Sequence, residues 1–177
     1  RVICGTDSEE IPVSLEGNSD SFRMKLSFLP NGNCVILPNI NGRGYGFFKI
    51  TEGESSGLWS VLRSSEDEVL KGSLLITLYE NLRWKTISPQ GFREEMLAYL
   101  PNESNSLLFS MALSYLGDCQ RIFPSDSRPL EQVLWKIVTT NPVSQHRLQA
   151  FRLYRSIADS EEAVQRLYTL WQERKAP

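Results

Sequence analysis

The sequence lacks common catalytic motifs, and its basic residues are not in excess over its acidic residues. Its 177 residues include one histidine, His146, and 19 Lys and Arg against 21 Asp and Glu. Zinc hydrolases use about three protein ligands and a general base, but His-Glu-x-x-His and Gly-x-Ser-x-Gly motifs are both missing. Nucleic-acid-binding proteins usually carry a basic excess. We therefore expect no nucleic-acid partner, assign no catalytic, cofactor-binding or metal-binding residue, and interpret His146 as a solvated or capping side chain.

Long apolar runs are also missing. The longest, such as "CVIL" and "SLLI", are a few residues long, whereas a membrane-spanning helix needs about 20. We expect no membrane span. The chain begins at Arg1 without a methionine or a targeting segment, so we interpret it as an excised piece or a mature product. Periplasmic, secreted and cytoplasmic locations all stay open.

Cysteine is scarce and scattered. Cys4, Cys34 and Cys119 lie far apart, and their odd number excludes a fully paired disulfide framework. No Cys-x-x-Cys motif is present, which argues against a zinc or redox site of that kind. We predict that the three cysteines are small buried thiols.

The first fifty or so residues have the period of β-strands. In "FRMKLSF", residues 22–28, apolar and polar side chains alternate, which is typical of a half-buried strand. Asn31-Gly32 follows and suits a tight turn, after which the chain returns as "CVIL". This predicts a hairpin over residues 22–37, with further strands at "IPVSL" and "YGFFKI" in a small antiparallel sheet or half sandwich.

Three glycines stand two apart in "NGRGYGFF", residues 41–48: Gly42, Gly44 and Gly46. A dinucleotide-binding loop has the spacing Gly-x-Gly-x-x-Gly and opens a helix, whereas this stretch leads into β-like "FFKI". A Walker-type loop would need Gly-Lys-Ser/Thr, which is missing here. The glycines therefore indicate a turn with positive φ or close backbone contacts.

From about Gly57 the apolar residues follow the period of helices. We expect Ser65 with Glu68, Ser88 with Pro89, Ser127 with Pro129, and Asp159 or Ser160 to mark helix starts, and Pro142 to break one. Short connections predict antiparallel helix hairpins stacked in a HEAT-like or solenoid-like manner. The predicted inward residues are Val69, Leu70, Leu74, Leu78 and Leu82; Leu107, Leu108, Met111, Ala112, Tyr115 and Leu116; Leu130, Val133, Leu134, Ile137 and Val138; Leu148, Phe151, Tyr154, Ile157 and Ala158; and Ala163, Val164, Leu167, Tyr168 and Trp171.

The fold class is therefore α+β, with a small β-domain over residues 1–55 and an α-helical domain over residues 56–177. The polar stretch "EGESSG", residues 52–57, is the expected junction.

Three charged or polar patterns remain. We interpret Glu94-Glu95 and Glu161-Glu162 as residues of first helical turns, where they complement the helix dipole. Arg152 and Arg155, with Arg147 nearby, indicate either a solvated helix face or a site for an anion or a peptide carboxylate. Asn102 begins the glycosylation pattern "NES", which has meaning on a secretory route.

Several motifs, in order, resemble the third and C-terminal domains of aminopeptidase N-like zinc metallopeptidases, the gluzincin aminopeptidases. "CVILPNINGRGYGFFKI" and "LWSVL" are similar to the family's Gly-aromatic-Tyr-Arg-Val strand and Trp-x-x-Leu helix, with Phe48 and Lys49 in place of tyrosine and arginine. Residues 70–104 are similar to the start of the family's helical C-terminal domain, and residues 150–177 resemble its later helix pairs. The resemblance covers most of the chain from Ile11 onward.

The resemblance implies a parent enzyme that removes N-terminal residues from peptides, with its zinc and catalytic motifs in an upstream domain. This chain would be non-catalytic alone. Its helices would cap the catalytic cleft and control peptide access, and its partners would be that domain and peptide substrates. An exposed apolar area would face the upstream domain and could make the isolated chain dimerise. Two alternatives stay open: an independent solenoid-like protein-binding module, and a family member that has lost its zinc site.

Overall fold

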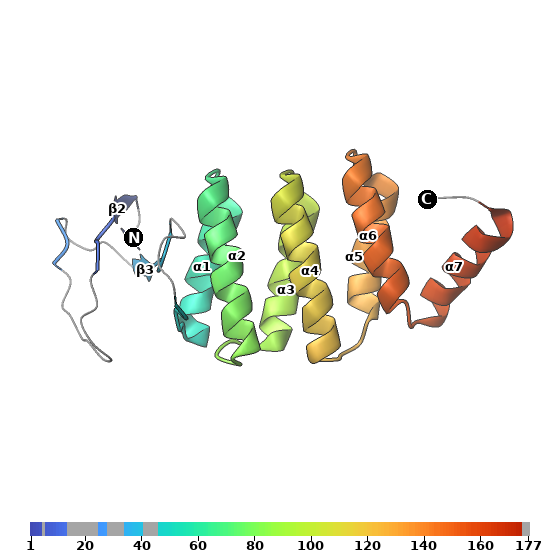
Figure 1. The fold of residues 1–177 in the computed structure, drawn as a ribbon, viewed down its shortest axis with the longest axis horizontal. Coiled ribbons are helices and arrows are strands. Elements are labelled where there is room, and N and C mark those ends of the chain that lie inside the picture. Colours follow the sequence, from blue (N-terminus) through green and yellow to red (C-terminus); the bar gives the residue numbers. More distant parts are fainter. Residues whose placement is uncertain (5, 14–24, 28–33, 41–45, 175–177) are drawn as a thin grey trace. The chain divides into compact units, whose positions relative to one another are not determined.

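A computed structural model describes residues 1–4, 6–13, 25–27, 34–40 and 46–174 (Figure 1). The chain forms two compact units, Arg1–Asn81 and Leu82–Pro177, and each is described by itself. The architecture is α+β and mostly helical, as the sequence predicts. No helix among the described residues is long and apolar enough to span a membrane.

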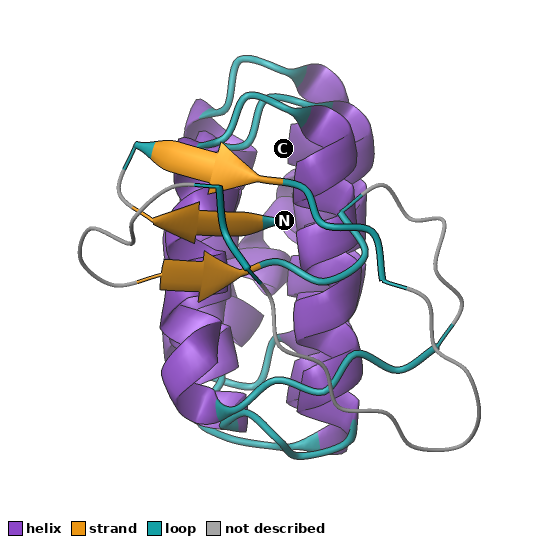
Figure 2. Cartoon of the chain, turned by 90° about the vertical axis from the view of Figure 1, so that its left-hand side faces the viewer, coloured by secondary structure: helices purple, strands orange, loops and turns teal. Residues whose placement is uncertain are grey.

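The first unit begins with three short strands, which Figure 2 shows as one sheet. They are β1 (Val2–Cys4), β2 (Asp7–Glu9) and β3 (Cys34–Ile36). The order is β2-β1-β3, and both pairs are antiparallel. Val2 and Cys4 are buried, so one face of β1 contributes to the core. The small antiparallel sheet is confirmed.

Within the described residues, the predicted strand pairing was wrong. β3 is a strand, but its partner is β1 rather than the stretch at residues 22–28. Of that stretch, residues 25–27 are described and lie outside any strand, as do residues 11–13 and 46–50 of the other two predicted strands. The predicted turn at Asn31-Gly32 lies outside the described residues. β1 pairs with one edge of β3, and this pairing continues where Leu37 N donates to Arg1 O at 2.8 Å.

Cys4 and Cys34 form a disulfide, so the prediction of three thiols was wrong for this pair. The two residues lie directly opposite each other in the β1–β3 register, with 4.3 Å between their Cα atoms. An odd number of cysteines allows one pair and one thiol. Cys119 is that thiol and is buried, as predicted.

The sheet is followed by α1 (Glu52–Ser64), which begins inside the polar stretch that was predicted as a junction. Thr51 and Glu54 form a capping box there, so a helix starts where composition alone indicated a linker. A Cβ atom at Gly57 would lie 2.7 Å from Val35 Cγ2. Glycine therefore allows α1 to approach β3. The proposed division of the chain near residue 55 stays a prediction.

Helix α2 (Glu68–Arg83) is capped by Asp67 and not by the predicted Ser65. Asp67 Oδ1 accepts from the backbone N–H groups of Val69 and Leu70 at 3.0 and 3.1 Å. Buried Asn81 accepts from Ile50 N at 2.9 Å and donates to Phe48 O at 2.8 Å. These bonds replace strand pairing for residues 46–50 and fix that segment to α2.

The second unit consists of helices. They are α3 (Pro89–Tyr99), the 3-10 turn η1 (Leu100–Asn102), α4 (Ser106–Ile122), α5 (Arg128–Thr140), α6 (Ser144–Ile157) and α7 (Glu161–Glu173). α3 packs on α4, and α6 packs on both α4 and α5 (Figure 1). Because short turns connect helices that lie side by side, the pairs α3–α4 and α5–α6 are antiparallel.

The predicted helix starts at Ser88-Pro89 and Ser160 are confirmed, because each serine accepts from the backbone N–H three residues later. Ser127 takes the N-cap position of α5 without a capping hydrogen bond. The predicted faces were partly wrong, since several residues placed inward are half or more exposed. These are Val69, Leu107, Leu148, Val164, Tyr168 and Trp171.

Candidate functional site

A cleft of about 1100 Å³ lies between α6 and α7, and we call it the α6–α7 cleft. Its polar lining includes Ser144 and Gln172. Its apolar lining consists of Leu148 and Phe151 of α6 and Leu167, Leu170 and Trp171 of α7. Arg147, Arg155 and Arg174 supply all of its charged side chains. Apolar surface with positive charge at the margin suits an anionic, partly apolar ligand.

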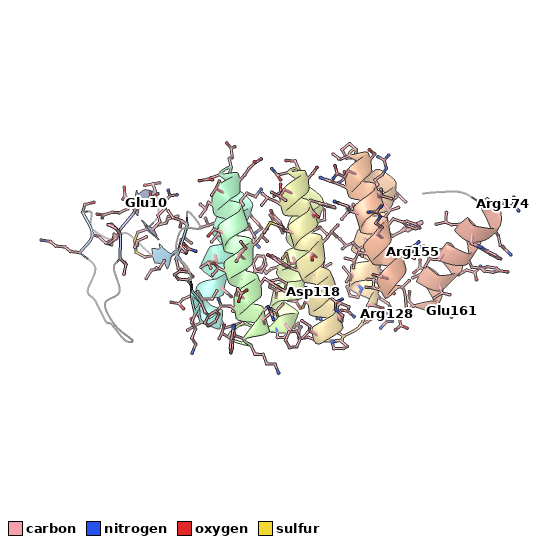
Figure 3. All side chains as sticks on the ribbon, in the orientation of Figure 1. Glu10, Asp118, Arg128, Arg155, Glu161 and Arg174 are labelled. Carbon is pink, nitrogen blue, oxygen red and sulfur yellow. A yellow bond between two sulfur atoms is a disulfide. The ribbon has the colours of Figure 1, made fainter. Side chains whose placement is uncertain are left out.

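The arginines that line the cleft come from different parts of the unit, and Figure 3 shows Arg155 on α6 and Arg174 at the end of α7. Arg147 stands in the first turns of α6, and its Nη1 donates to the backbone oxygen of Asn141 at 2.9 Å. Arg155 lies in the last turn of α6, where a cation complements the helix dipole. Arg174 ends α7 in the left-handed conformation, with φ 51°.

The sequence grouped Arg147, Arg152 and Arg155, and the structure brings two of these to the cleft. Arg147, Phe151 and Arg155 are spaced four apart and therefore share a helix face. Arg152 is exposed and is not among the lining residues. Sequence reasoning missed Arg174, because nothing in the sequence shows which side of α7 faces α6.

Glu131 of α5 fixes the turn from which α7 starts. Its carboxylate accepts from Asp159 N at 2.8 Å, Ser160 N at 3.1 Å and Ser127 Oγ at 2.9 Å, and Ser160 Oγ also donates to it. Burial acts to raise the pKa of Glu131, but these hydrogen bonds outweigh it and hold the pKa below its ordinary value. Glu131 is thus a charged, buried anchor between α5 and the α6–α7 turn.

An aromatic contact holds the same side of α7. The guanidinium of Arg166 lies 5.2 Å from the ring centre of Trp135, and Trp135 contacts Tyr154 at 5.2 Å between ring centres. Arg166 also pairs with Glu162 one turn earlier in α7. This face of α7 therefore contacts α5, while Trp171 remains 74% exposed.

His146 is buried, so its interpretation as a solvated or capping residue was wrong. Its ring stacks on Phe109 of α4 with 4.0 Å between centres, and Nε2 lies 3.0 Å from Ser106 Oγ. Burial lowers the pKa of His146, and nearby Glu103 partly opposes this. Within the described residues Nδ1 has no hydrogen-bond partner. The Ser–His pair thus lacks the orienting acceptor of a nucleophilic triad and is a packing contact between α4 and α6.

The described residues do not suit zinc. In the described part of the chain, no three His, Cys, Asp or Glu residues come together in a group that could hold a metal ion. The predicted place of Glu161-Glu162 in the first turn of α7 is confirmed. That of Glu94-Glu95 was wrong, because α3 begins at Pro89 and its first turn has no acidic residue.

Two sequence candidates remain, the glycine stretch at residues 41–48 and the glycosylation pattern at Asn102. Residues 41–45 of the glycine stretch lie outside the described residues, and Gly46 has φ +155°, in keeping with the predicted positive φ. Asn102 is exposed at the end of η1, where its Nδ2 donates to Ala98 O at 3.1 Å. The α6–α7 cleft is thus the feature best formed to receive a ligand. Comparisons of the chain with protein-family models, curated proteins and solved structures returned no match.

Proposed function

We propose that this chain is the non-catalytic C-terminal region of an aminopeptidase N-like zinc metallopeptidase. In this proposal the parent removes N-terminal residues from peptides with a zinc ion held upstream. The helical part caps the catalytic cleft and controls which peptides reach it. The ordered sequence resemblance and the α+β architecture, with a small sheet before stacked helices, both support the proposal.

One observation carries the proposal, and it concerns the first unit. Large apolar side chains are exposed on three of its segments: Ile36 of β3, Phe47 of the segment before α1, and Val69 and Ile76 of α2. Val69 and Ile76 are seven residues apart and share one face of α2. Exposed apolar side chains that share a face, as Val69 and Ile76 do, form a surface suited to contact with another protein part. An upstream catalytic domain would cover it.

The isolated chain provides the first test. We expect substoichiometric zinc and no hydrolysis of aminoacyl p-nitroanilides, because the ligands and the general base would lie upstream. One zinc per chain together with robust turnover would overturn the proposal. The coding sequence before Arg1 gives an independent test, since it should contain a His-Glu-x-x-His stretch. A stretch with altered ligands would indicate a family member that has lost its zinc site.

The apolar surface of the first unit can be tested separately. Sedimentation velocity should show a concentration-dependent dimer of the isolated chain, and the variant Val69→Asp/Ile76→Asp should be monomeric. Leu107→Asp is the matched control, because Leu107 is 70% exposed but belongs to α4 of the second unit. A monomeric wild-type chain, or equal dimerisation by both variants, would contradict an interface at α2.

An independent protein-binding module is the second candidate. The α6–α7 cleft favours it, because a preformed cleft with arginines and an exposed tryptophan has the composition of protein-binding hot spots. The two candidates differ in the coding sequence: a module of this kind needs no peptidase motif upstream.

A further inference from the structure

We propose that the α6–α7 cleft binds an acidic amphipathic helix of a partner protein, one that carries carboxylates on one face and bulky apolar side chains on the other. The proposal rests on the second unit alone. It therefore stands whether or not the chain belongs to a peptidase.

The apolar lining defines one half of the partner's chemistry. Trp171 is 74% exposed and Leu148 is 50% exposed, although both line a concave surface. Phe151, Leu167 and Leu170 are partly covered beside them. Bulky apolar side chains of a partner would remove this surface from water, which is the main driving force of association. Tryptophan and arginine are also the residues that most often dominate binding energy at interfaces.

The charges define the other half. All charged residues that line the cleft are arginines, and among the described residues no ion pair engages Arg147, Arg155 or Arg174. Three other arginines of the second unit have carboxylate partners, in the pairs Arg121–Asp118, Arg128–Asp126 and Arg166–Glu162, whereas exposed Arg152 has none among the described residues. Three arginines thus gather at the cleft, and no carboxylate of the described residues pairs with them. Charge complementarity therefore calls for carboxylates from the partner.

The size of the cleft favours a chain segment over a small molecule. Its volume of about 1100 Å³ is slightly above the ~300–1,000 Å³ of small-ligand pockets. Both long walls are helices, and an amphipathic helix laid between two helices is a common mode of peptide recognition. Glu131 and the Arg166–Trp135 contact hold α7 in place from the opposite side. The cleft is thus formed before a partner arrives, which lowers the cost of binding.

Fluorescence anisotropy with three labelled peptides of about four helical turns tests the proposal on the full chain. The first peptide has glutamates on one face and leucines on the other. In the second, lysines replace the glutamates, and in the third, serines replace the leucines. We expect saturable binding of the first peptide, at least roughly tenfold weaker binding of the other two, and a loss of affinity as salt rises.

Charge-reversal variants assign the binding to the cleft. Arg155→Glu and Arg174→Glu should each weaken binding of the first peptide roughly tenfold, because a repulsive carboxylate replaces an attractive cation. Arg152→Glu is the matched control: it makes the same change on the same helix outside the cleft, and should alter the affinity by at most about twofold. Circular dichroism melts check that all three variants keep the fold.

Four results would overturn the proposal. The first is no saturable binding of the glutamate–leucine peptide, and the second is equal binding of the lysine–leucine peptide. The third is equal weakening by Arg152→Glu and Arg155→Glu. The fourth is evidence for a different occupant. Self-association that Arg155→Glu abolishes would assign the cleft to a second copy of the chain. If the chain co-sedimented with anionic lipid vesicles and did not bind the peptides, the cleft would be assigned to a membrane surface.

Discussion

Replacement of Glu131 by alanine should release α7 from the rest of the second unit. The substitution removes the acceptor for two backbone N–H groups, of Asp159 and Ser160, and for two serine hydroxyls. A buried donor left without a partner costs ~1–3 kcal/mol. The two amides are partly exposed, so the loss of each hydrogen bond should cost a free energy near the lower end of this range. We expect a total loss of about 3 kcal/mol in the free energy of unfolding, including the hydroxyls.

Two measurements report this loss. Urea unfolding followed by circular dichroism gives the global free energy, and hydrogen exchange gives the opening of α7 separately. The amides of Asp159, Ser160 and the first turns of α7 should exchange faster in Glu131→Ala, while those of α4 remain protected. Glu131→Gln keeps the size of the side chain and one accepting oxygen, so we expect a smaller loss of about 1 kcal/mol.

Glu161→Gln is the matched control, because Glu161 is exposed in the first turn of α7 and interacts mainly with the helix dipole. It should lower stability by no more than ~0.3–1 kcal/mol. The reasoning would be refuted if Glu131→Ala unfolded at the same urea concentration as Glu161→Gln with its Asp159 and Ser160 amides still protected. The pH dependence adds a check. The pKa of folded Glu131 is lowered from 4.5, so its stabilisation is complete above that value and is lost as pH falls through the folded pKa.

Three further predictions concern other residues. The pKa of His146 is lowered from 6.5 by burial, so the unfolded chain binds a proton more readily, and stability should fall as pH drops below about 6.5. His146→Leu should flatten this pH dependence of the free energy of unfolding, measured by urea titration. An unchanged pH dependence in this variant would contradict the prediction. Reduction of the Cys4–Cys34 disulfide, whose sequence separation is 30, should destabilise the first unit by about 3–4 kcal/mol, measured by thermal melts with and without dithiothreitol; coinciding melts would count against it. The thiol of Cys119 is buried with a raised pKa, so it should react with a disulfide reagent only on unfolding, and rapid labelling of the native chain would disprove its burial.

The helices were predictable from the sequence to the extent that periodicity and capping residues act locally. Ser88-Pro89 and Ser160 begin helices because a serine hydroxyl satisfies a nearby N–H whatever the tertiary context. The inward face of α7 was not predictable. Apolar residues lie on several sides of that helix, and its buried side chain is Ala163 while Trp171 is exposed. The choice of face depends on Glu131 and Trp135, which are far away in sequence.

The strands could not be predicted for a different reason. β1 and β2 have three residues each, too few for alternation to show. Pairing of β1 with β3 joins residues about thirty positions apart, and the register places Cys4 opposite Cys34. Cysteine spacing alone does not reveal pairing. Of the candidate site, the sequence indicated Arg147 and Arg155, whose spacing puts them on one helix face, but could not supply the wall that α7 provides.

The close approach of α1 to β3 at Gly57 means that two distant positions share one volume. A methyl group at residue 57 would occupy space that Val35 Cγ2 now fills, and β-branched valine has little rotamer freedom with which to retreat. Neither position can grow unless the other shrinks. Gly57→Ala should therefore be damaging alone and be suppressed by Val35→Ala. Among homologous sequences, side-chain sizes at these two positions should covary, with a larger residue at one accompanied by a smaller residue at the other. Such covariation would reveal the contact between β3 and α1.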